Sequence, residues 1–230
     1  MTLKEKAIIA KNKVITVLKY CFPNQCYGCR KLCLDLVCTT CEKEFTLLLQ
    51  TDPMHIRGIN KIWYFADYHQ CIKSALHELK FNKNMAMGKR LNRSIKERID
   101  DLKSVVDMST LWVPVPSHKK RYKERGYDVL DVLFDRCIPM KQINKQLVYR
   151  TKNTPYLYTL NHQKRKAALK NAFEIDNANA GQIENKNVVI YDDILTTGAS
   201  VEAVAKKILI YKPKTINAVI FSVTPKNENC

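Results

Sequence analysis

The segment that most restricts the fold is VVIYDDILTTGASVEAVAKKIL, residues 188–209. Its first four residues are β-branched or aromatic and predict a buried strand, and the stretch that opens at Ser200 predicts a helix. Two acidic residues and a turn rich in hydroxyl groups lie between them. Because open parallel sheets bind ligands at the carboxyl ends of their strands, the segment predicts an α/β protein with a binding site at this turn.

The turn has the composition of a phosphate-binding loop. Gly198 permits close approach to the backbone, hydroxyl side chains can donate hydrogen bonds, and the start of the helix presents unpaired N–H groups to an anion. Asp192 and Asp193 would repel a phosphate, so we expect them to bind sugar hydroxyls or a magnesium ion. The alternative is an ordinary strand followed by an N-capped helix. The predicted ligand-binding residues are Asp192, Asp193, Ile194, Leu195, Thr196, Thr197, Gly198, Ala199 and Ser200.

The nine cysteines are concentrated near the amino end, where two pairs have the spacing C-x-x-C. Each such pair can clamp one side of a tetrahedral ion, so we predict a closed, structural zinc site made by Cys26, Cys29, Cys38 and Cys41. Cys33 lies between the pairs and is the main rival ligand. Buried unpaired thiols are the alternative, and a redox role fits less well because there are two pairs and no βαβ context.

The composition is that of a folded protein, since 46% of the residues are hydrophobic and only 6 Gly and 8 Pro are present. Residues 4–20 mix lysines with apolar residues, which predicts a helix and not a secretory leader. No stretch approaches the roughly 20 apolar residues that cross a bilayer, so we expect no membrane span. These features together predict a cytoplasmic protein.

Cysteine distribution and periodicity divide the chain into four predicted parts. They are an N-terminal helix (1–20), a four-cysteine zinc module (21–45), a strand and helix region packed on the core (46–110) and a larger α/β domain (111–230). In the third part we expect a strand over 62–66 and helices over 72–80 and 87–99. In the fourth, strand patterns alternate with helical ones, which predicts a mostly parallel sheet flanked by helices. The expected elements there are strands over 111–115, 147–149, 188–191 and 216–223, a helix beginning near Gly126 and a helix over 201–211.

The segment VPVPSHKKRYKERGYDVLDVL, residues 113–133, places a basic run directly after a strand. The backbone after Pro116 and the residues Ser117, Lys119 and Arg125 form a candidate pyrophosphate-binding segment. The alternative is that the run is a solvated charged face, which is the usual role of such a run.

The net charge of +17 favours an anionic partner such as nucleic acid, although a basic solvated surface is the alternative. Residues 136–173 contain nine Lys or Arg, no acidic residue and interleaved tyrosines, a pattern typical of single-stranded nucleic-acid binding. A mobile flap closing over pyrophosphate would need the same cations. The candidate nucleic-acid contacts are Lys120, Arg121, Arg150, Lys152, Lys164, Arg165, Lys166, Tyr156 and Tyr158.

The order of these motifs resembles the ComF family of competence-associated proteins, which includes the ComFC and GntX groups. The shared features are the cysteine pairs, Val-Pro-Val-Pro, Arg125-Gly126-Tyr127 and a loop that resembles the type I phosphoribosyltransferase signature. The resemblance covers nearly the whole chain and extends to Leu79-Lys80-Phe81, Arg165 and Ala172-Phe173. The chain departs from the family at Asp128-Val129, where Asn-Gln is usual, and at Ala168, where Asn is usual.

The resemblance implies a type I phosphoribosyltransferase fold that binds phosphoribosyl pyrophosphate with Mg²⁺, the two acids holding the 2′- and 3′-hydroxyls and the loop holding the 5′-phosphate. It also implies a cytoplasmic protein required for natural transformation, which handles incoming single-stranded DNA and has other competence or DNA-processing proteins as partners. A metabolic phosphoribosyltransferase that acts on a nitrogenous base, with Asp192 and Asp193 as catalytic residues, is the alternative. Residues 51–110 show no convincing base-recognising hood for it. A catalytically silent fold is the third reading.

Overall fold

The computed structural model describes residues 20–21, 23–43, 49–52, 54–105, 107, 109–153 and 167–225. Nearly all of the predicted N-terminal helix (1–20) therefore lies outside the described residues. The same holds for five of the candidate nucleic-acid contacts, Tyr156, Tyr158, Lys164, Arg165 and Lys166.

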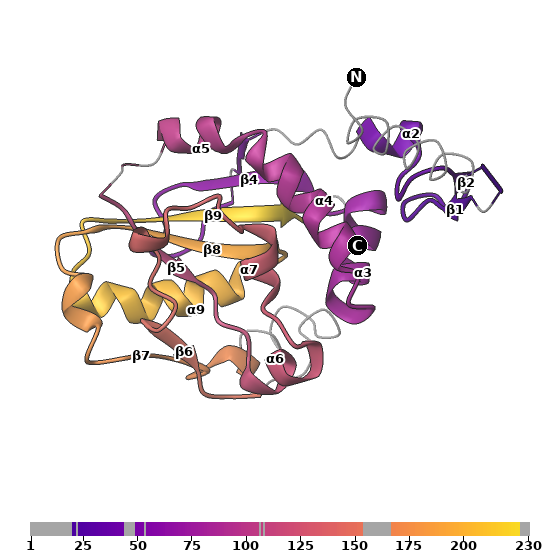
Figure 1. Cartoon of the computed structure of the whole chain (residues 1–230). Helices are drawn as coiled ribbons and strands as arrows, with labels where there is room; N and C mark the ends of the chain where they lie inside the picture. The colour runs from indigo at the N-terminus through magenta and orange to yellow at the C-terminus, as the bar shows by residue number, and fades with distance from the viewer. Residues whose placement is uncertain are drawn as a thin grey trace, which may run out of the picture.

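A five-stranded sheet forms the centre of the described structure (Figure 1). In spatial order, its strands are β3 (Gln50–Thr51), β4 (Ile62–Asp67), β9 (Thr215–Val223), β8 (Asn187–Leu195) and β5 (Leu111–Pro114). β3 is antiparallel to β4, and the other neighbours are parallel. The predicted α/β class with a mostly parallel sheet is confirmed, and β4 joins the same sheet as the strands of the larger predicted part.

Helices cover both faces of the sheet because the inner strands alternate between two apolar cores. On β8, Val188 and Ile190 face one core, and Val189 and Tyr191 face the other. The first core is covered by α9 (Ala199–Ile208), and the second by α3 (Gln70–Phe81), α4 (Met85–Lys96) and α7 (Val129–Leu133) (Figure 1). The remaining helical elements are α5 (Ile99–Val105), α6 (Lys119–Arg125), η2 (Met140–Gln142), η4 (Ala180–Gln182) and η5 (Leu209–Tyr211).

A separate two-stranded sheet packs beside α9. β6 (Val148–Arg150) is antiparallel to β7 (Phe173–Ile175). We predicted a strand at 147–149 but grouped it with the strands of the central sheet, and that grouping is wrong. The short strand instead pairs with β7, which satisfies its backbone groups while Val148 and Phe173 enter the α9 core.

The basic run after β5 forms a helix, and Gly126 ends that helix instead of beginning the next one. Its φ of +86° lies in the left-handed region, and its N–H donates to the carbonyl of Tyr122 at 2.7 Å. Asp128 then caps α7, since its Oδ1 accepts a hydrogen bond of 2.8 Å from the N–H of Leu130. The predicted helix near Gly126 is thus α7, which begins at Val129, and the helix of the basic run, α6, was not predicted.

The cysteine-rich part is a small module of short elements, β1 (Asn24–Gln25), β2 (Leu32–Cys33) and α2 (Thr39–Glu42). It docks on α3 and α4, because Cys26 and Cys41 belong to the same core as these helices and Glu42 forms an ion pair with Arg90 of α4. Gly28 allows this contact, since a Cβ there would overlap the Sγ of Cys71 at the start of α3.

Candidate functional site

The carboxyl ends of β5 and β8 lie side by side. Pro114 pairs with Tyr191, and the N–H of Val115 donates to the carbonyl of Tyr191 at 2.9 Å. α9, which follows β8, covers one face of the sheet, whereas α7, which lies beyond β5, covers the other. Both strands thus end at the same carboxyl edge of the sheet. Open α/β sheets bind ligands outside the carboxyl ends of their strands.

The predicted phosphate loop lies at this carboxyl edge. β8 runs to Leu195, the turn comprises Thr196, Thr197 and Gly198, and α9 begins at Ala199. Gly198 has a φ of +73° and accepts the first helical hydrogen bond, 2.8 Å, from the N–H of Glu202. A hollow of about 20 Å³ beside the turn is lined by Asp192, Ile194, Leu195, Thr196, Thr197, Gly198, Ala199, Ser200 and Val201. The structure thus brings together every predicted loop residue except Asp193.

Asp193 is absent from this hollow because successive residues of a strand point to opposite faces. Its carboxylate pairs with Nζ of Lys80, on the last turn of α3, at 2.6 Å, and the two side chains are only 19% and 15% exposed. Asp192 lies on the loop side, and its Oδ1 accepts a hydrogen bond of 2.8 Å from the N–H of Asp193. The two acids therefore flank the sheet edge from opposite sides.

Burial raises the pKa of Asp192 well above its ordinary value, and the neighbouring charge of Asp193 raises it further. The N–H of Asp193 and the cations Lys80 and Arg150 oppose this shift without cancelling it. A ligand that supplies hydroxyl donors or a cation to this carboxyl group would favour its ionised form. The acid pair is therefore poised to bind such a ligand.

Lys80 was not predicted as a site residue, although it stands in the Leu79-Lys80-Phe81 resemblance. The tertiary structure brings that segment against Arg125-Gly126-Tyr127, 48 residues further along. The hydroxyl of Tyr127 donates to the carbonyl of Leu79, and the guanidinium of Arg125 lies 5.8 Å from the ring centre of Phe81. These contacts hold the end of α3 so that Lys80 reaches Asp193.

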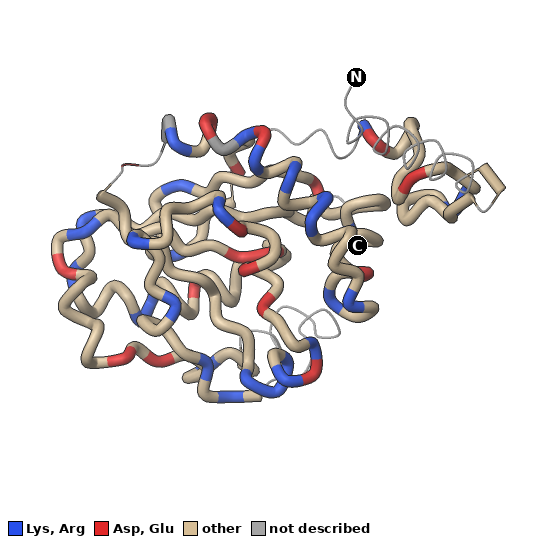
Figure 2. The backbone as a smooth tube through the Cα atoms, in the orientation of Figure 1, with Lys and Arg blue, Asp and Glu red and all other residues tan. Residues whose placement is uncertain are grey.

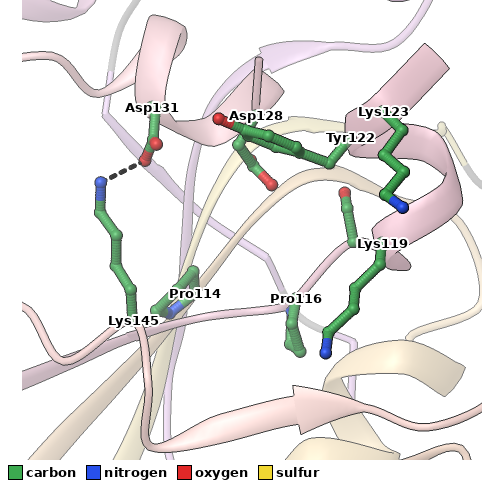
Figure 3. A pocket seen from close by; sticks show the side chains of 9 residues that line it. Pro114, Pro116, Lys119, Tyr122, Lys123, Asp128, Asp131 and Lys145 are labelled. Carbon is green, nitrogen blue, oxygen red and sulfur yellow. Dashed lines mark ion pairs between the residues drawn. The ribbon is translucent and has the colours of Figure 1, made fainter. Parts of the chain in front are cut away.

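A larger cavity, of about 460 Å³, opens beside the end of β5 (Figure 3). Of the predicted pyrophosphate segment, Pro116, Ser117 and Lys119 line it, whereas Arg125 does not. Lys123, another cation of the predicted basic run, lines it too. The remaining lining residues were not predicted as site residues, and they are Pro114, Tyr122, Asp128, Asp131 and Lys145. We call it the Tyr122 cavity.

Asp128, a position where the chain departs from the ComF pattern, lines this cavity. Its pKa is raised by burial first, and also by the charges of Asp131 and Asp193, while Arg125 opposes the shift. An electrostatic effect of Asp193 on Asp128 means that the Tyr122 cavity and the acid pair are electrostatically connected. Asp131 in turn pairs with Nζ of Lys145 at 2.5 Å.

The described candidate nucleic-acid contacts do not share one environment. Arg150 is only 9% exposed; its guanidinium lies 5.3 Å from the ring centre of Phe173, and its Nε donates to the carbonyl of Lys152 at 3.3 Å. Burial, and then the charge of Arg121, lower the pKa of Arg150 to about 10, against the effect of Asp192. Arg150 and Arg121 thus belong to the surroundings of the loop. Lys120 is exposed on α6, where basic residues gather (Figure 2).

The four predicted cysteine ligands form one cluster, in which all four Sγ atoms lie within 4.8 Å of one another. The Sγ atoms of Cys29 and Cys38 are 3.7 Å apart, which matches the edge of about 3.8 Å of a tetrahedron with zinc–sulfur bonds of about 2.3 Å. Although burial opposes ionisation, hydrogen bonds from the N–H groups of Cys38, Cys29 and Gly28 lower the pKa of the Cys26 thiol to about 6. The cluster can therefore bind a metal ion such as zinc.

The rival ligand Cys33 lies outside this group. Its thiol donates to the carbonyl of Asp35 at 3.0 Å, and burial raises its pKa, so it stays protonated. The fold of the loop therefore decides that Cys33 is not one of the clustered cysteines.

A separate finding concerns membranes: among the residues that the structure describes, no helix combines the length and the apolar character needed to span a bilayer.

Fold and site define an α/β protein with a mostly parallel five-stranded sheet and with a four-cysteine cluster near its amino end. No family model matches the chain. Over 151 residues it is 28% identical to the DNA utilization protein YhgH of Escherichia coli K12, and 26% identical to that of Salmonella typhimurium. The match covers 63% of this chain and 63% of each relative, so the chain spans less than two thirds of the length of these relatives.

Solved structures with a similar backbone include two phosphoribosyltransferases. The hypoxanthine phosphoribosyl transferase of Trypanosoma cruzi is 14% identical with a TM-score of 0.35, over 64% of this chain and 69% of that one. The hypoxanthine-guanine phosphoribosyl transferase of L. donovani is 12% identical with a TM-score of 0.34, over 59% and 71%.

Proposed function

We propose that the protein binds phosphoribosyl pyrophosphate, or another 5′-phosphorylated ribose, at residues 192–200, and that it handles single-stranded DNA as a ComF-type protein of natural transformation. The observation that carries the proposal is the hydroxyl-lined turn that opens α9 directly after two acids, at the carboxyl edge of the sheet. The homology to DNA utilization proteins supports the DNA part of the proposal.

The loop supplies what a 5′-phosphate needs. The first N–H groups of α9 and the hydroxyls of Thr196, Thr197 and Ser200 donate hydrogen bonds to the phosphate oxygens. Asp192 and Asp193 accept hydrogen bonds from the ribose hydroxyls, and the ion pair with Lys80 orients Asp193. Asp192 would hold a Mg²⁺ ion, which would supply positive charge to the pyrophosphate.

We infer that Cys26, Cys29, Cys38 and Cys41 bind a structural zinc ion. The four thiolates would fill all four positions of a tetrahedral site, which would leave no position open for a substrate or a reactive water. The N–H of Cys38 donates to the Sγ of Cys26 at 3.3 Å, which is a contact that stabilises a thiolate ligand.

The replacement Asp192→Asn is expected to weaken the binding of phosphoribosyl pyrophosphate with Mg²⁺ at least about tenfold, because hydrogen bonds to a charged acceptor contribute about 1.5–3 kcal/mol. Isothermal titration calorimetry measures the change. The variant remains folded: the pKa of Asp192 is raised in the native state, so ionisation at pH 7 destabilises the unliganded protein, and a neutral amide removes that cost. Thermal unfolding at pH 7 should show a stability equal to or above that of the wild type.

Asp100→Asn is the matched control, since the side chain of Asp100 is 91% exposed on α5. It should change neither affinity nor stability. An unchanged affinity of Asp192→Asn would show that the acid pair does not bind the ligand, and the proposal would then be wrong.

Binding of single-stranded DNA should weaken with salt, because cations that contact phosphates release counterions. For Z contacted phosphates, the logarithm of the binding constant should fall against the logarithm of salt concentration with a slope of about −0.7Z. Lys120→Ala on α6 should reduce that slope by about 0.7, and Lys103→Ala on α5 should leave it unchanged. Fluorescence anisotropy with a labelled oligonucleotide measures both slopes, and salt-independent binding would remove the DNA assignment.

The Tyr122 cavity, which gives a second reactant room beside the loop, favours one alternative, a working phosphoribosyltransferase with a nitrogenous base as acceptor. Release of pyrophosphate on addition of a common base would support that reaction.

A further inference from the structure

We infer that the Tyr122 cavity binds one nucleotide, with its base stacked on Tyr122 and its phosphate held by Lys119 and Lys123. The inference rests on the proposed function and deepens it, because it places a second ligand beside the phosphoribosyl loop. With about 460 Å³, the cavity falls within the range of about 300–1,000 Å³ that small-molecule sites occupy. It is much larger than the hollow of about 20 Å³ at the loop itself.

The cationic wall of the cavity fits a phosphate. Lys119 and Lys123 are four residues apart on α6 and therefore lie on one face of the helix, and Figure 3 shows both on the same side of the cavity. Within the described part of the chain, neither lysine forms an ion pair, whereas Lys145 on the opposite side pairs with Asp131. Their charges are thus available to an anionic ligand.

Tyr122 offers an aromatic face to the ligand. Its side chain lines the cavity and is 52% exposed, and α6 buries none of its residues, so the ring does not belong to the apolar core. Bases of every kind stack on such rings, because each has a π-face of similar size. An inorganic anion has no ring that could stack on this aromatic surface.

The acidic side of the cavity distinguishes a nucleotide from a simple polyphosphate. Asp128 points into the space between Tyr122 and the lysines (Figure 3), and ionised carboxylates accept hydrogen bonds but cannot donate them. Asp128 would repel a second phosphate but can accept from an amino or ring N–H of a base. A ligand with a phosphate at one end and N–H groups at the other can bind both the cationic and the acidic wall of the cavity.

The position of the cavity ties it to the phosphoribosyl site. Pro114 in its wall pairs with Tyr191, the residue before Asp192, and the charge of Asp193 acts on Asp128. A nucleotide here would lie next to the ligand of the loop. Both a free nucleotide and the end of a DNA strand have the required chemistry, and the experiment distinguishes them.

Binding of 2′-deoxyadenosine 5′-monophosphate to the full chain is measured with saturating ribose 5-phosphate, which fills the loop. The nucleotide should still bind, and 2-deoxyribose 5-phosphate, which lacks a base, should bind much more weakly at this second site. Tyr122→Ala should weaken nucleotide binding about tenfold through lost stacking, and Tyr122→Phe should preserve it. The matched control is Tyr149→Ala, since Tyr149 is 44% exposed on β6 outside the cavity and should not affect binding.

The source of the nucleotide follows from a second titration with a short oligodeoxyadenylate. If the oligonucleotide binds more tightly than the mononucleotide and depends equally on Tyr122, the site holds a DNA strand; equal affinities indicate a free nucleotide. Complete competition by ribose 5-phosphate, or a Tyr122→Ala variant with wild-type affinity, would overturn the inference while leaving the loop assignment intact. Conversely, failure of ribose 5-phosphate to bind would contradict the proposed function, whereas the effect of Tyr122→Ala on nucleotide binding would still test the inference about the cavity.

Discussion

Removal of the metal from the purified protein with a strong chelator is expected to unfold the cysteine module, residues 23–43, while the central sheet stays folded. The elements of the module are two strands of two residues each and a helix of four, which cannot hold themselves together in water. Apparent binding energies of structural zinc in small domains are about 10–16 kcal/mol, so the metal would dominate the stability of this part. Hydrogen exchange should show lost protection at Cys26 and Tyr27, whose N–H groups bond within the module, but not along β8 and β9.

The cysteines themselves provide a matched pair of variants. Cys38→Ser removes a member of the cluster and should reproduce the effect of the chelator, whereas Cys33→Ser alters a thiol in the same loop that lies outside it. Bound zinc, measured by elemental analysis, should fall in Cys38→Ser and remain in Cys33→Ser. Equal damage from both replacements would argue against the assigned ligand set.

The replacement Gly198→Ala is expected to destabilise the protein by about 2–4 kcal/mol and to weaken the binding of ribose 5-phosphate. Two effects add. A side chain in the left-handed region costs about 1–2 kcal/mol. In addition, the new Cβ would lie 2.5 Å from Cδ1 and 2.9 Å from Cγ1 of Ile56, which must then shift. Because Gly198 is the N-cap of α9, any adjustment moves the N–H groups that would face a bound phosphate.

Two other glycines separate these effects in urea unfolding. Gly126 has a φ of +86° but nothing within 4 Å of a Cβ, so Gly126→Ala should show the backbone cost alone. Gly181 has neither constraint, and Gly181→Ala should stay within about 0.5 kcal/mol of the wild type. A cost at Gly198 no larger than the cost at Gly126 would show that Ile56 yields freely and that the loop is not tightly packed.

Features that depend on neighbouring residues in the sequence were predicted, and features that depend on contacts between distant segments were not. The strand, turn and helix around Gly198 were predicted because apolar pattern, acids and hydroxyls stand within a few consecutive residues. The cysteine cluster was predicted for the same reason, although the pattern left Cys33 open as a ligand until the hydrogen bond to Asp35 excluded it. The basic run was assigned to the pyrophosphate side without recognition that it forms α6 and ends at Gly126.

The amino-acid sequence by itself determined the α/β class, the strand, turn and helix around Gly198 and the two cysteine pairs, because each depends on spacing along one short piece of chain. Tertiary structure alone decided that Lys80 pairs with Asp193 and that Tyr122, Asp128 and Lys145 surround one cavity. These residues come from segments far apart in sequence, and their meeting depends on strand order and on which face each helix covers. No local pattern encodes that arrangement, since it results from burying both faces of the sheet at once.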